Sequence, residues 1–369
     1  MIFSLWLVVV TAFLLGAAMG SFLNVCIWRL PREGMGISSP RRSHCPSCGF
    51  TIPWQDNLPI IAWLRLGAHC RSCRSPISAR YPVIEALTAA AFGVITHRYL
   101  ADGIPQPGIL GVVLAVTASC IVLSFIDQDL QIIPDEITIP GMLSVLPLAL
   151  LIPGLHQPPQ GYVYEILESA SGGFAGIAAL LPAASHGSVV SFLASGTVAA
   201  GCSLGGIIGY RLYWMTAHGG EIRPLKDCLL AALITGLTGG VLALMVLRPE
   251  WAVHPRIHSF WAALAGMAAG SGLVLGVGIL GRQVFRKDAM GFGDVKLMGF
   301  LGGFTGWIGV LAGFAIACFI GSAVGIWRLL RSRSRYLPFG PYLALGCLLL
   351  IIWPQVFRQA LDWYLGLFR

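Results

Sequence analysis

The stretch MIFSLWLVVVTAFLLGAAMGSFL, residues 1–23, decides the class of this protein, because it holds no charged side chain and is long enough to cross a bilayer. The rest of the chain has the same character. Of its 369 residues, 56% are hydrophobic and only 11% are charged, whereas a soluble domain carries about 25% charged residues. This composition excludes a soluble globular fold, a disordered chain and a soluble nucleic-acid binder, and it predicts the lipid bilayer as the surroundings.

The basic residues predict the orientation of the chain. No basic residue precedes the stretch 1–23, and Arg29 and Arg32 follow it, so we expect an uncleaved first span with its N-terminus outside. The loop 24–82 holds eight Arg against only Glu33 and Asp56. Because cytoplasmic loops are enriched in Lys and Arg, this loop is predicted to be cytoplasmic and folded.

Further apolar segments predict nine more spans. They are 83–97, 108–126, 137–153, 189–210, 228–247, 259–280, 295–307, 308–327 and 338–353. Ten crossings place 19 of the 24 Lys and Arg residues on the cytoplasmic side, which supports the count. The weakly apolar segment 169–185 does not fit it and is interpreted as re-entrant or interfacial.

Four cysteines in the loop 24–82 predict a metal site. Cys45 and Cys48 form one C-x2-C pair, and Cys70 and Cys73 form another after a gap of 21 residues, which is the spacing of a structural zinc ribbon. Two disulfides are the alternative, but the reducing cytoplasm disfavours them. A histidine precedes each pair, and both are interpreted as surface residues because four thiolates already complete the zinc shell; they are His44 and His69. The predicted fold class is therefore an all-α polytopic membrane protein of about ten transmembrane helices with a cytoplasmic zinc-ribbon-like loop.

Two carboxylates at the edges of predicted spans suggest catalysis. Asp127 ends the third span, and Asp294 follows Gly291 and Gly293 at the start of the eighth, both on the predicted cytoplasmic side. A carboxylate at the bilayer edge is costly and needs a reason. Two that lie together can act as base and acid on water and a peptide bond, as in aspartic proteases. The two glycines would let a substrate backbone approach.

The neighbouring polar residues leave alternatives open. Asp127 and Asp129 point about 200° apart on a helix, so only one of them can face a given partner. Asp135 follows a proline and is expected to cap the next helix. Asn24 and Glu85 lie at the inner ends of the first two spans, where they serve either substrate contact or interfacial polarity. Asp129 and Asp135 are further candidates for substrate or cofactor contact.

Lys296 also has two interpretations. It lies two residues after Asp294, so it either tunes that carboxyl group or pairs with phospholipid headgroups.

These motifs together resemble the type IV prepilin peptidases, the bacterial leader peptidases and N-methyltransferases of type IV pilus and type II secretion systems. The resemblance runs along most of the chain. It rests on Gly20-Ser21-Phe22-Leu23-Asn24-Val25, Arg29-Leu30-Pro31, the two cysteine pairs, Arg80-Tyr81-Pro82 with Glu85, the Asp127 segment, Gly291-Phe292-Gly293-Asp294-Val295-Lys296 and Pro338-Phe339-Gly340-Pro341.

The resemblance implies a site and a reaction. Asp127 and Asp294 would be the catalytic pair, since the first aspartate of the family lies eight residues before the Asp of its Leu-Pro-Asp element, here Ile133-Pro134-Asp135. Gly291, Gly293 and Lys296 would support the second aspartate. The substrates would be prepilins and pseudopilins with basic leader peptides, and pilus or secretion machinery would be the partner. The enzyme would act at the cytoplasmic face of the bacterial inner membrane, with structural zinc in the loop.

Methylation of the new N-terminus by S-adenosylmethionine is implied by the resemblance alone. The sequence contains no strand with a Gly-rich turn that would announce a soluble methyl-donor fold.

One departure from the family pattern concerns the length between the aspartates. About 100 residues are expected to be inserted there, which gives five regions. These are a first helix (1–23), the zinc loop (24–82), helices with the first aspartate (83–154), the inserted membrane segment (155–259) and helices with the Gly-x-Gly-Asp motif (260–369).

Two other functions compete with the peptidase. One is a polytopic transporter whose aspartates form a proton relay, and the other is a non-catalytic, zinc-stabilised membrane scaffold. A transporter should place its aspartates near mid-span and repeat its halves, and the sequence shows neither.

Overall fold

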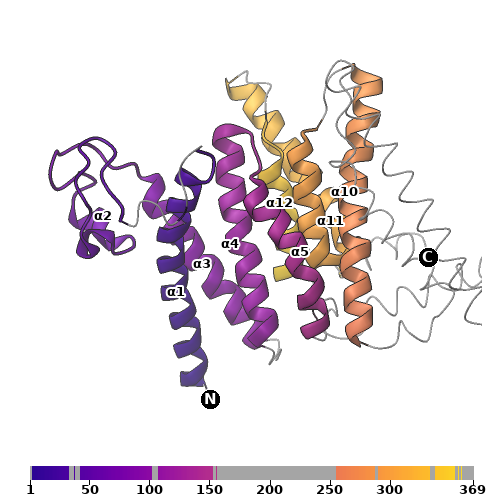
Figure 1. Ribbon diagram of the computed structural model, residues 1–369, viewed down its shortest axis with the longest axis horizontal. Coiled ribbons are helices and arrows are strands. Elements are labelled where there is room, and N and C mark those ends of the chain that lie inside the picture. Colours follow the sequence, from indigo (N-terminus) through magenta and orange to yellow (C-terminus); the bar gives the residue numbers. More distant parts are fainter. Residues whose placement is uncertain are drawn as a thin grey trace, which may run out of the picture. The chain divides into compact units, whose positions relative to one another are not determined.

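The computed structural model describes residues 2–32, 37, 42–101, 107–152, 155, 255–286, 290–332, 337–353, 356 and 359. These residues form helices and loops, with two isolated β-bridges and no β-strand among them, which confirms the all-α prediction (Figure 1). The helices are α1 (Ile2–Arg29), η1 (Trp54–Asn57), α2 (Ile61–Arg65), α3 (Arg80–Ala101), α4 (Pro107–Leu130), α5 (Asp135–Leu151), α10 (Pro255–Phe285), α11 (Phe292–Ser332) and α12 (Gly340–Ile352).

In the part of the chain that the structure describes, four helices are long and apolar enough to cross a bilayer. They are Trp6–Arg29 in α1, Pro107–Leu130 in α4, Ser259–Val284 in α10 and Phe292–Arg331 in α11. The predicted spans 83–97, 137–153 and 338–353 coincide with α3, α5 and α12. Ten crossings are therefore not confirmed, although a membrane protein is. The predicted spans 189–210 and 228–247, the segment 169–185 and nearly all of the insertion 155–259 lie outside the described residues.

Two helix ends differ from the sequence prediction. Helix α1 continues past residue 23 to Arg29, because the apolar pattern goes on and the first helix breaker is Pro31. The predicted spans 295–307 and 308–327 together form α11, which is interrupted at Gly306, where φ is 70° and ψ is 175°. A residue with these angles cannot continue a helix, so α11 consists of two segments, 292–305 and 307–332.

The chain divides into two compact units. The first contains residues 1–137 and 317–353, and the second contains 138–316 and 354–369. In the first unit α1 packs along α3, and α4 packs against α1, α3 and α12. The buried side chains between these helices form its core. They are Leu23, Cys26, Ile27, Ile84, Phe92, Ala118, Ile121, Val122 and Ile126.

The second unit is built on close contact between helix backbones. Val145 and Ala149 of α5 pack with Ala263 and Met267 of α10. A Cβ added at Gly266 of α10 would lie 2.0 Å from the carbonyl oxygen of Gly302 in α11. Only glycine fits there, which is the small-residue packing typical of membrane helices. This contact fixes the segment of α11 that begins with the Gly-x-Gly-Asp motif.

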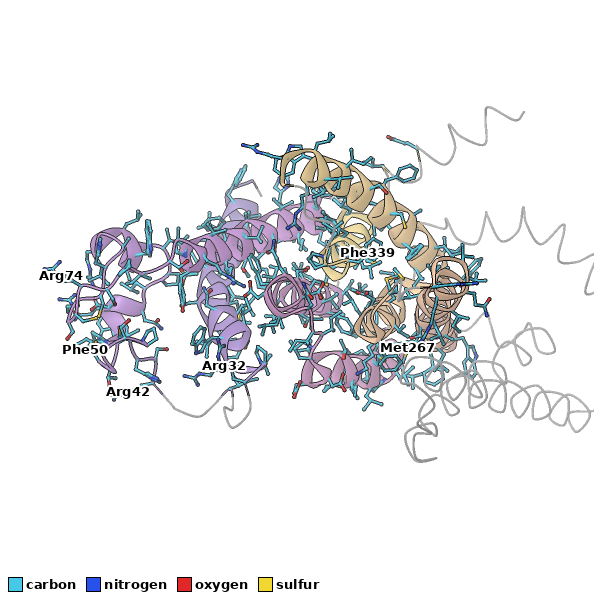
Figure 2. The ribbon with its side chains drawn as sticks, turned by 90° about the horizontal axis from the view of Figure 1, so that it is seen from above. Arg32, Arg42, Phe50, Arg74, Met267 and Phe339 are labelled. Carbon is cyan, nitrogen blue, oxygen red and sulfur yellow. The ribbon has the colours of Figure 1, made fainter. Side chains whose placement is uncertain are left out.

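Residues 42–79 of the first unit form a separate lobe at the C-terminal end of α1, around α2 (Figure 1). We call it the cysteine lobe. Figure 2 shows Phe50 and Arg74 at its outer edge.

Candidate functional site

The four predicted metal ligands lie together in the cysteine lobe. The Sγ atoms of Cys45, Cys48, Cys70 and Cys73 all lie within 4.8 Å of one another, and those of Cys45 and Cys73 are 3.8 Å apart. Four sulfurs around zinc at about 2.3 Å form a tetrahedron with edges of about 3.8 Å. The donor set and its spacing therefore fit a zinc ion. Both His44 and His69 are exposed, and neither belongs to the cluster.

The two cysteine pairs are the same structural unit repeated 25 residues later. The N–H of Cys45 donates to the carbonyl of Phe50 at 2.9 Å, and the N–H of Cys70 donates to that of Ser75 at 2.8 Å. Equivalent bonds run from Gly49 to Cys45 and from Arg74 to Cys70. Two equal turns facing each other bring four thiols to one point. The sequence predicted the pairs but not the extent of this repeat.

The turns also favour the thiolate form, the form that binds metal, at two of the four cysteines. The backbone N–H groups of Ser47 and Cys48 donate to the sulfur of Cys45 and lower the pKa of its thiol to about 6. The pKa of Cys73 is lowered as well, chiefly by the hydroxyl group of Ser75. Deprotonated sulfur is the zinc ligand, so the turns favour metal binding at Cys45 and Cys73. The N–H of Phe50 lowers the pKa of Cys48, but burial and the hydrogen bonds to Cys73 and Cys45 outweigh it and raise that pKa to about 11.

Asp56 is the ionic centre of the lobe. Its side chain, only 3% exposed, accepts hydrogen bonds from Arg71 at 2.6 Å and from Arg65 at 2.7 Å. The paired contact with Arg71, and then that with Arg65, lowers the pKa of Asp56. Sequence reasoning treated this residue as a loop charge. The signal that could have found it is its position as one of two acids among eight arginines.

Asp127 lies in the last turns of α4, where its side chain is buried, with the residue 7% exposed. Its Oδ2 atom accepts a hydrogen bond of 3.1 Å from the N–H of Gly340, the first residue of α12. A helix N-terminus carries unpaired N–H groups and partial positive charge, so it stabilises a carboxylate there. Asp127 therefore has a defined orientation.

Gly340 is needed for this contact. A Cβ added at this position would lie 2.7 Å from Oδ2 and 3.2 Å from Cγ of Asp127. The Pro-Phe-Gly-Pro motif thus starts α12 with a residue that lets the backbone reach the carboxylate. The sequence showed the Pro-Phe-Gly-Pro motif but could not indicate its role, because 213 positions separate Gly340 from Asp127.

Asp129 has different surroundings. It is exposed and forms an ion pair with Arg80 of α3, whose guanidinium also donates to the carbonyl of Phe125 at 3.2 Å. The two aspartates of α4 thus face different neighbours, as their angular separation predicted. Asp135 is exposed in the first turn of α5, where a carboxylate stabilises the helix.

Asp294 belongs to the second unit and lies, half-buried, in the first turn of α11. Its N–H donates to the carbonyl of Gly291 at 3.1 Å. Lys296 lies with its Nζ atom 5.0 Å from the centroid of the Phe292 ring, within cation–π range. Since Asp127 and Asp294 lie in different units, their pairing stays a prediction.

Asn24 and Glu85 connect α1, α3 and the cysteine lobe. Both are buried, with 8% of each residue exposed. The Asn24 side chain donates to the carbonyl of Tyr81 at 3.1 Å, and Oε2 of Glu85 accepts the N–H of Ile60 at 2.7 Å. Ile60 has a φ of 62°, unusual for a β-branched residue, in a tight turn closed by a bond from Ile61 to Pro59. Both polar residues also line a pocket of about 580 Å³.

Two separate parts of the chain match known protein families. Residues 14–99 match the Bacterial Peptidase A24 N-terminal domain, and residues 226–326 match the Type IV leader peptidase family. The chain belongs to the type IV leader peptidase family. The first match contains the four cysteines and the second contains Asp294, while Asp127 lies between them.

Curated relatives of this leader peptidase family carry one name. A "Prepilin leader peptidase/N-methyltransferase" of Aeromonas hydrophila is 27% identical over 98% of this chain and 94% of its own length, and one of Pseudomonas aeruginosa is 26% identical over 96% and 93%. One of Myxococcus xanthus is 43% identical over 137 residues, but the match spans only 39% of that relative. No solved structure shows a significant match. The prediction of a peptidase is confirmed at the level of the family, and the transporter is not favoured.

Proposed function

We propose that this protein removes leader peptides from prepilin-like precursors, with Asp127 and Asp294 as the acid–base pair, and then methylates the new N-terminus. One observation carries the proposal: the carboxyl group of Asp127 is buried near the end of a membrane helix and held by the N–H of Gly340. The names of the curated relatives supply the substrate and the second activity.

The surroundings of Asp127 suit a catalytic carboxylate. Burial of a carboxyl group is costly, and a structural carboxylate would recover that cost by pairing with a cation. Among the described residues, the contact at Asp127 is a single neutral donor, Gly340, on Oδ2. Its other oxygen is then available to water. In the proposed reaction, one aspartate takes a proton from water, the oxygen of which attacks the peptide carbonyl, and the other gives a proton to the leaving amine.

We propose the same membrane arrangement that the charge pattern predicts, with about ten crossings and the cysteine lobe in the cytoplasm of a bacterial inner-membrane protein. Zinc would be held by Cys45, Cys48, Cys70 and Cys73, and it would stabilise the fold of the lobe without taking part in the reaction. Pilus or secretion machinery would supply the precursors. Gly291 and Gly293 would leave room for the substrate backbone beside Asp294.

Cleavage of a prepilin by the full chain in membranes tests the peptidase proposal. We expect Asp127→Asn and Asp294→Asn to reduce cleavage at least 10³-fold, about the magnitude of lost acid–base catalysis. Glu136→Gln, an exposed acid in α5, is the matched control and should cleave normally. Zinc content and melting temperature report folding. Normal cleavage by either folded aspartate variant would refute the acid–base pair.

The methylation proposal needs its own measurement. The mass of the mature N-terminus, determined with and without S-adenosylmethionine, should increase by one methyl group only when that donor is present. An unchanged mass would remove this activity and leave the peptidase proposal intact.

A further inference from the structure

Two exposed tryptophans of α1 indicate where this helix enters and leaves the bilayer. Trp6 and Trp28 lie about 33 Å apart along the helix axis, at the usual rise of about 1.5 Å per residue. The hydrocarbon core of a bilayer is about 30 Å thick, and tryptophan is enriched at its two surfaces. Arg32, whose guanidinium lies 3.4 Å from the centroid of the Trp28 ring, can reach the headgroups at that end. Trp28 therefore marks the membrane surface on the side of the cysteine lobe.

Contacts with α3 hold part of the cysteine lobe on the bilayer side of Trp28. A Cβ added at Gly20 would lie 2.6 Å from Cα of Glu85, so Glu85 is level with Gly20. That level is about 12 Å along α1 from Trp28 toward the centre of the bilayer. Oε2 of Glu85 accepts the N–H of Ile60 at 2.7 Å. Because a glutamate side chain and one hydrogen bond are too short to return to the level of Trp28, Ile60 and the start of α2 lie at the depth of the membrane surface.

The lobe lies beside the helices at this depth. In Figure 1 it extends along the C-terminal part of α1, and in Figure 2, seen from above, it lies to one side of the helices. Near the same level, α1 and α3 carry the exposed apolar side chains of Phe22 and Leu87. Such side chains are stable against lipid tails, which are as apolar as they are. The lobe therefore borders on the lipid that surrounds these two helices.

The part of the lobe that Glu85 holds at this depth has an apolar surface. Ile61 and Leu64 lie three residues apart on one face of α2 and are 61% and 65% exposed, whereas Ala62 is buried. Trp54 of η1, which packs against α2, is 74% exposed. We call Trp54, Ile61 and Leu64 the apolar face of the lobe. Arg65, the last residue of α2, adds an exposed cation next to this face.

We propose that the apolar face of the lobe inserts into the bilayer leaflet around the C-terminal end of α1 and anchors the lobe to lipid. Interfacial segments combine Trp and Leu on one side with Arg on the other, and they are buried about 5–10 Å deep. The Arg65 side chain is long enough to reach the headgroups from there. The loop 24–82, with eight Arg against two acids, favours anionic phospholipids in that leaflet. This assignment does not rest on the proposed function.

Photo-cross-linking of the zinc-loaded full chain tests the anchor. Leu64 is replaced by the photoreactive residue benzoylphenylalanine in nanodiscs of phosphatidylethanolamine and phosphatidylglycerol, without any precursor. We expect a phospholipid adduct at residue 64, which mass spectrometry identifies. The same replacement of Leu14, an exposed residue in the middle of α1, is the positive control and should also give a lipid adduct. Replacement of Arg74, at the outer edge of the lobe in Figure 2, should give none.

Ile61 gives a second probe position on the same face, and zinc content and melting temperature show whether each variant is folded. The anchor is overturned if neither Ile61 nor Leu64 yields a lipid adduct while Leu14 does, or if Arg74 reacts with lipid to the same extent. It is also overturned if an added prepilin replaces lipid as the cross-linked partner at residue 64, because the apolar face would then be a precursor site. Without prepilin the result does not depend on cleavage, so failure of the peptidase proposal would leave it unchanged.

Discussion

Replacing Gly340 with alanine is expected to slow cleavage by displacing Asp127 while leaving the fold in place. The new Cβ would meet Oδ2 at 2.7 Å, and ordinary contacts begin near 3.4 Å, so the carboxyl group must move by about 0.7 Å. Misplacement of a reacting group by about 1 Å costs about 10²-fold in rate. The expected loss in kcat is therefore roughly 10- to 100-fold, or about 1.4–2.7 kcal/mol.

The assay is steady-state cleavage of a prepilin by the full chain in nanodiscs. We expect kcat to fall with little change in KM, because Gly340 contacts the carboxylate and has no proposed contact with substrate. Gly111→Ala is the matched control on α4, since an added Cβ there meets nothing within 4 Å. It should keep wild-type kcat. Wild-type kcat in a folded Gly340→Ala variant would refute the reasoning that this backbone contact positions Asp127.

Three further predictions concern the cysteine lobe. Cys45→Ser should lose bound zinc, and its lobe should become sensitive to proteases. Cys318→Ser, which lies outside the cluster, should keep both the zinc and the protease resistance. Metal analysis and limited proteolysis measure the two properties. Arg74 has a φ of 59°, a left-handed conformation that costs an L-residue about 1–2 kcal/mol. Glycine adopts it without that strain but loses about 0.5–1 kcal/mol in chain entropy on folding. Arg74→Gly should therefore stabilise the lobe by up to about 1 kcal/mol in a denaturant titration, and a loss of stability would contradict this. The pKa of Asp56 is lowered in the folded protein, so its ionised carboxylate stabilises the fold. This stabilisation is complete above the unfolded pKa of about 3.9 and is lost as the pH falls through the lower folded value. The melting temperature of the wild type should therefore fall in acid, and that of Asp56→Asn should fall less.

Local patterns in the sequence predicted the membrane class, most helix positions and the cluster of four cysteines. The length of the apolar runs predicted α1, α4 and α10. The spacing of the cysteines predicted that they cluster, and in the structure their four Sγ atoms lie within 4.8 Å of one another. Both signals are local or nearly so. The boundary predicted between the spans 295–307 and 308–327 lies within two residues of the break at Gly306.

Contacts between distant segments were beyond the reach of these patterns. Nothing in helical periodicity joins Asp127 to Gly340 across 213 positions, and the strained turn at Ile60 depends on an acceptor, Glu85, from another element. For Asn24 and Glu85, the sequence left substrate contact and interfacial polarity open. The structure gives both residues hydrogen bonds that tie helices and lobe together, and it also places them in a pocket.

The four thiols of the cysteine cluster differ in burial. Cys45 and Cys70, the first cysteine of each repeat, are buried, whereas Cys48 and Cys73 are exposed. We therefore expect chelators, oxidants and competing soft metals to reach the cluster first at Cys48 and Cys73. We expect zinc to enter and leave through the exposed pair, and oxidation to begin there, while the buried pair remains the last attachment of the ion to the protein.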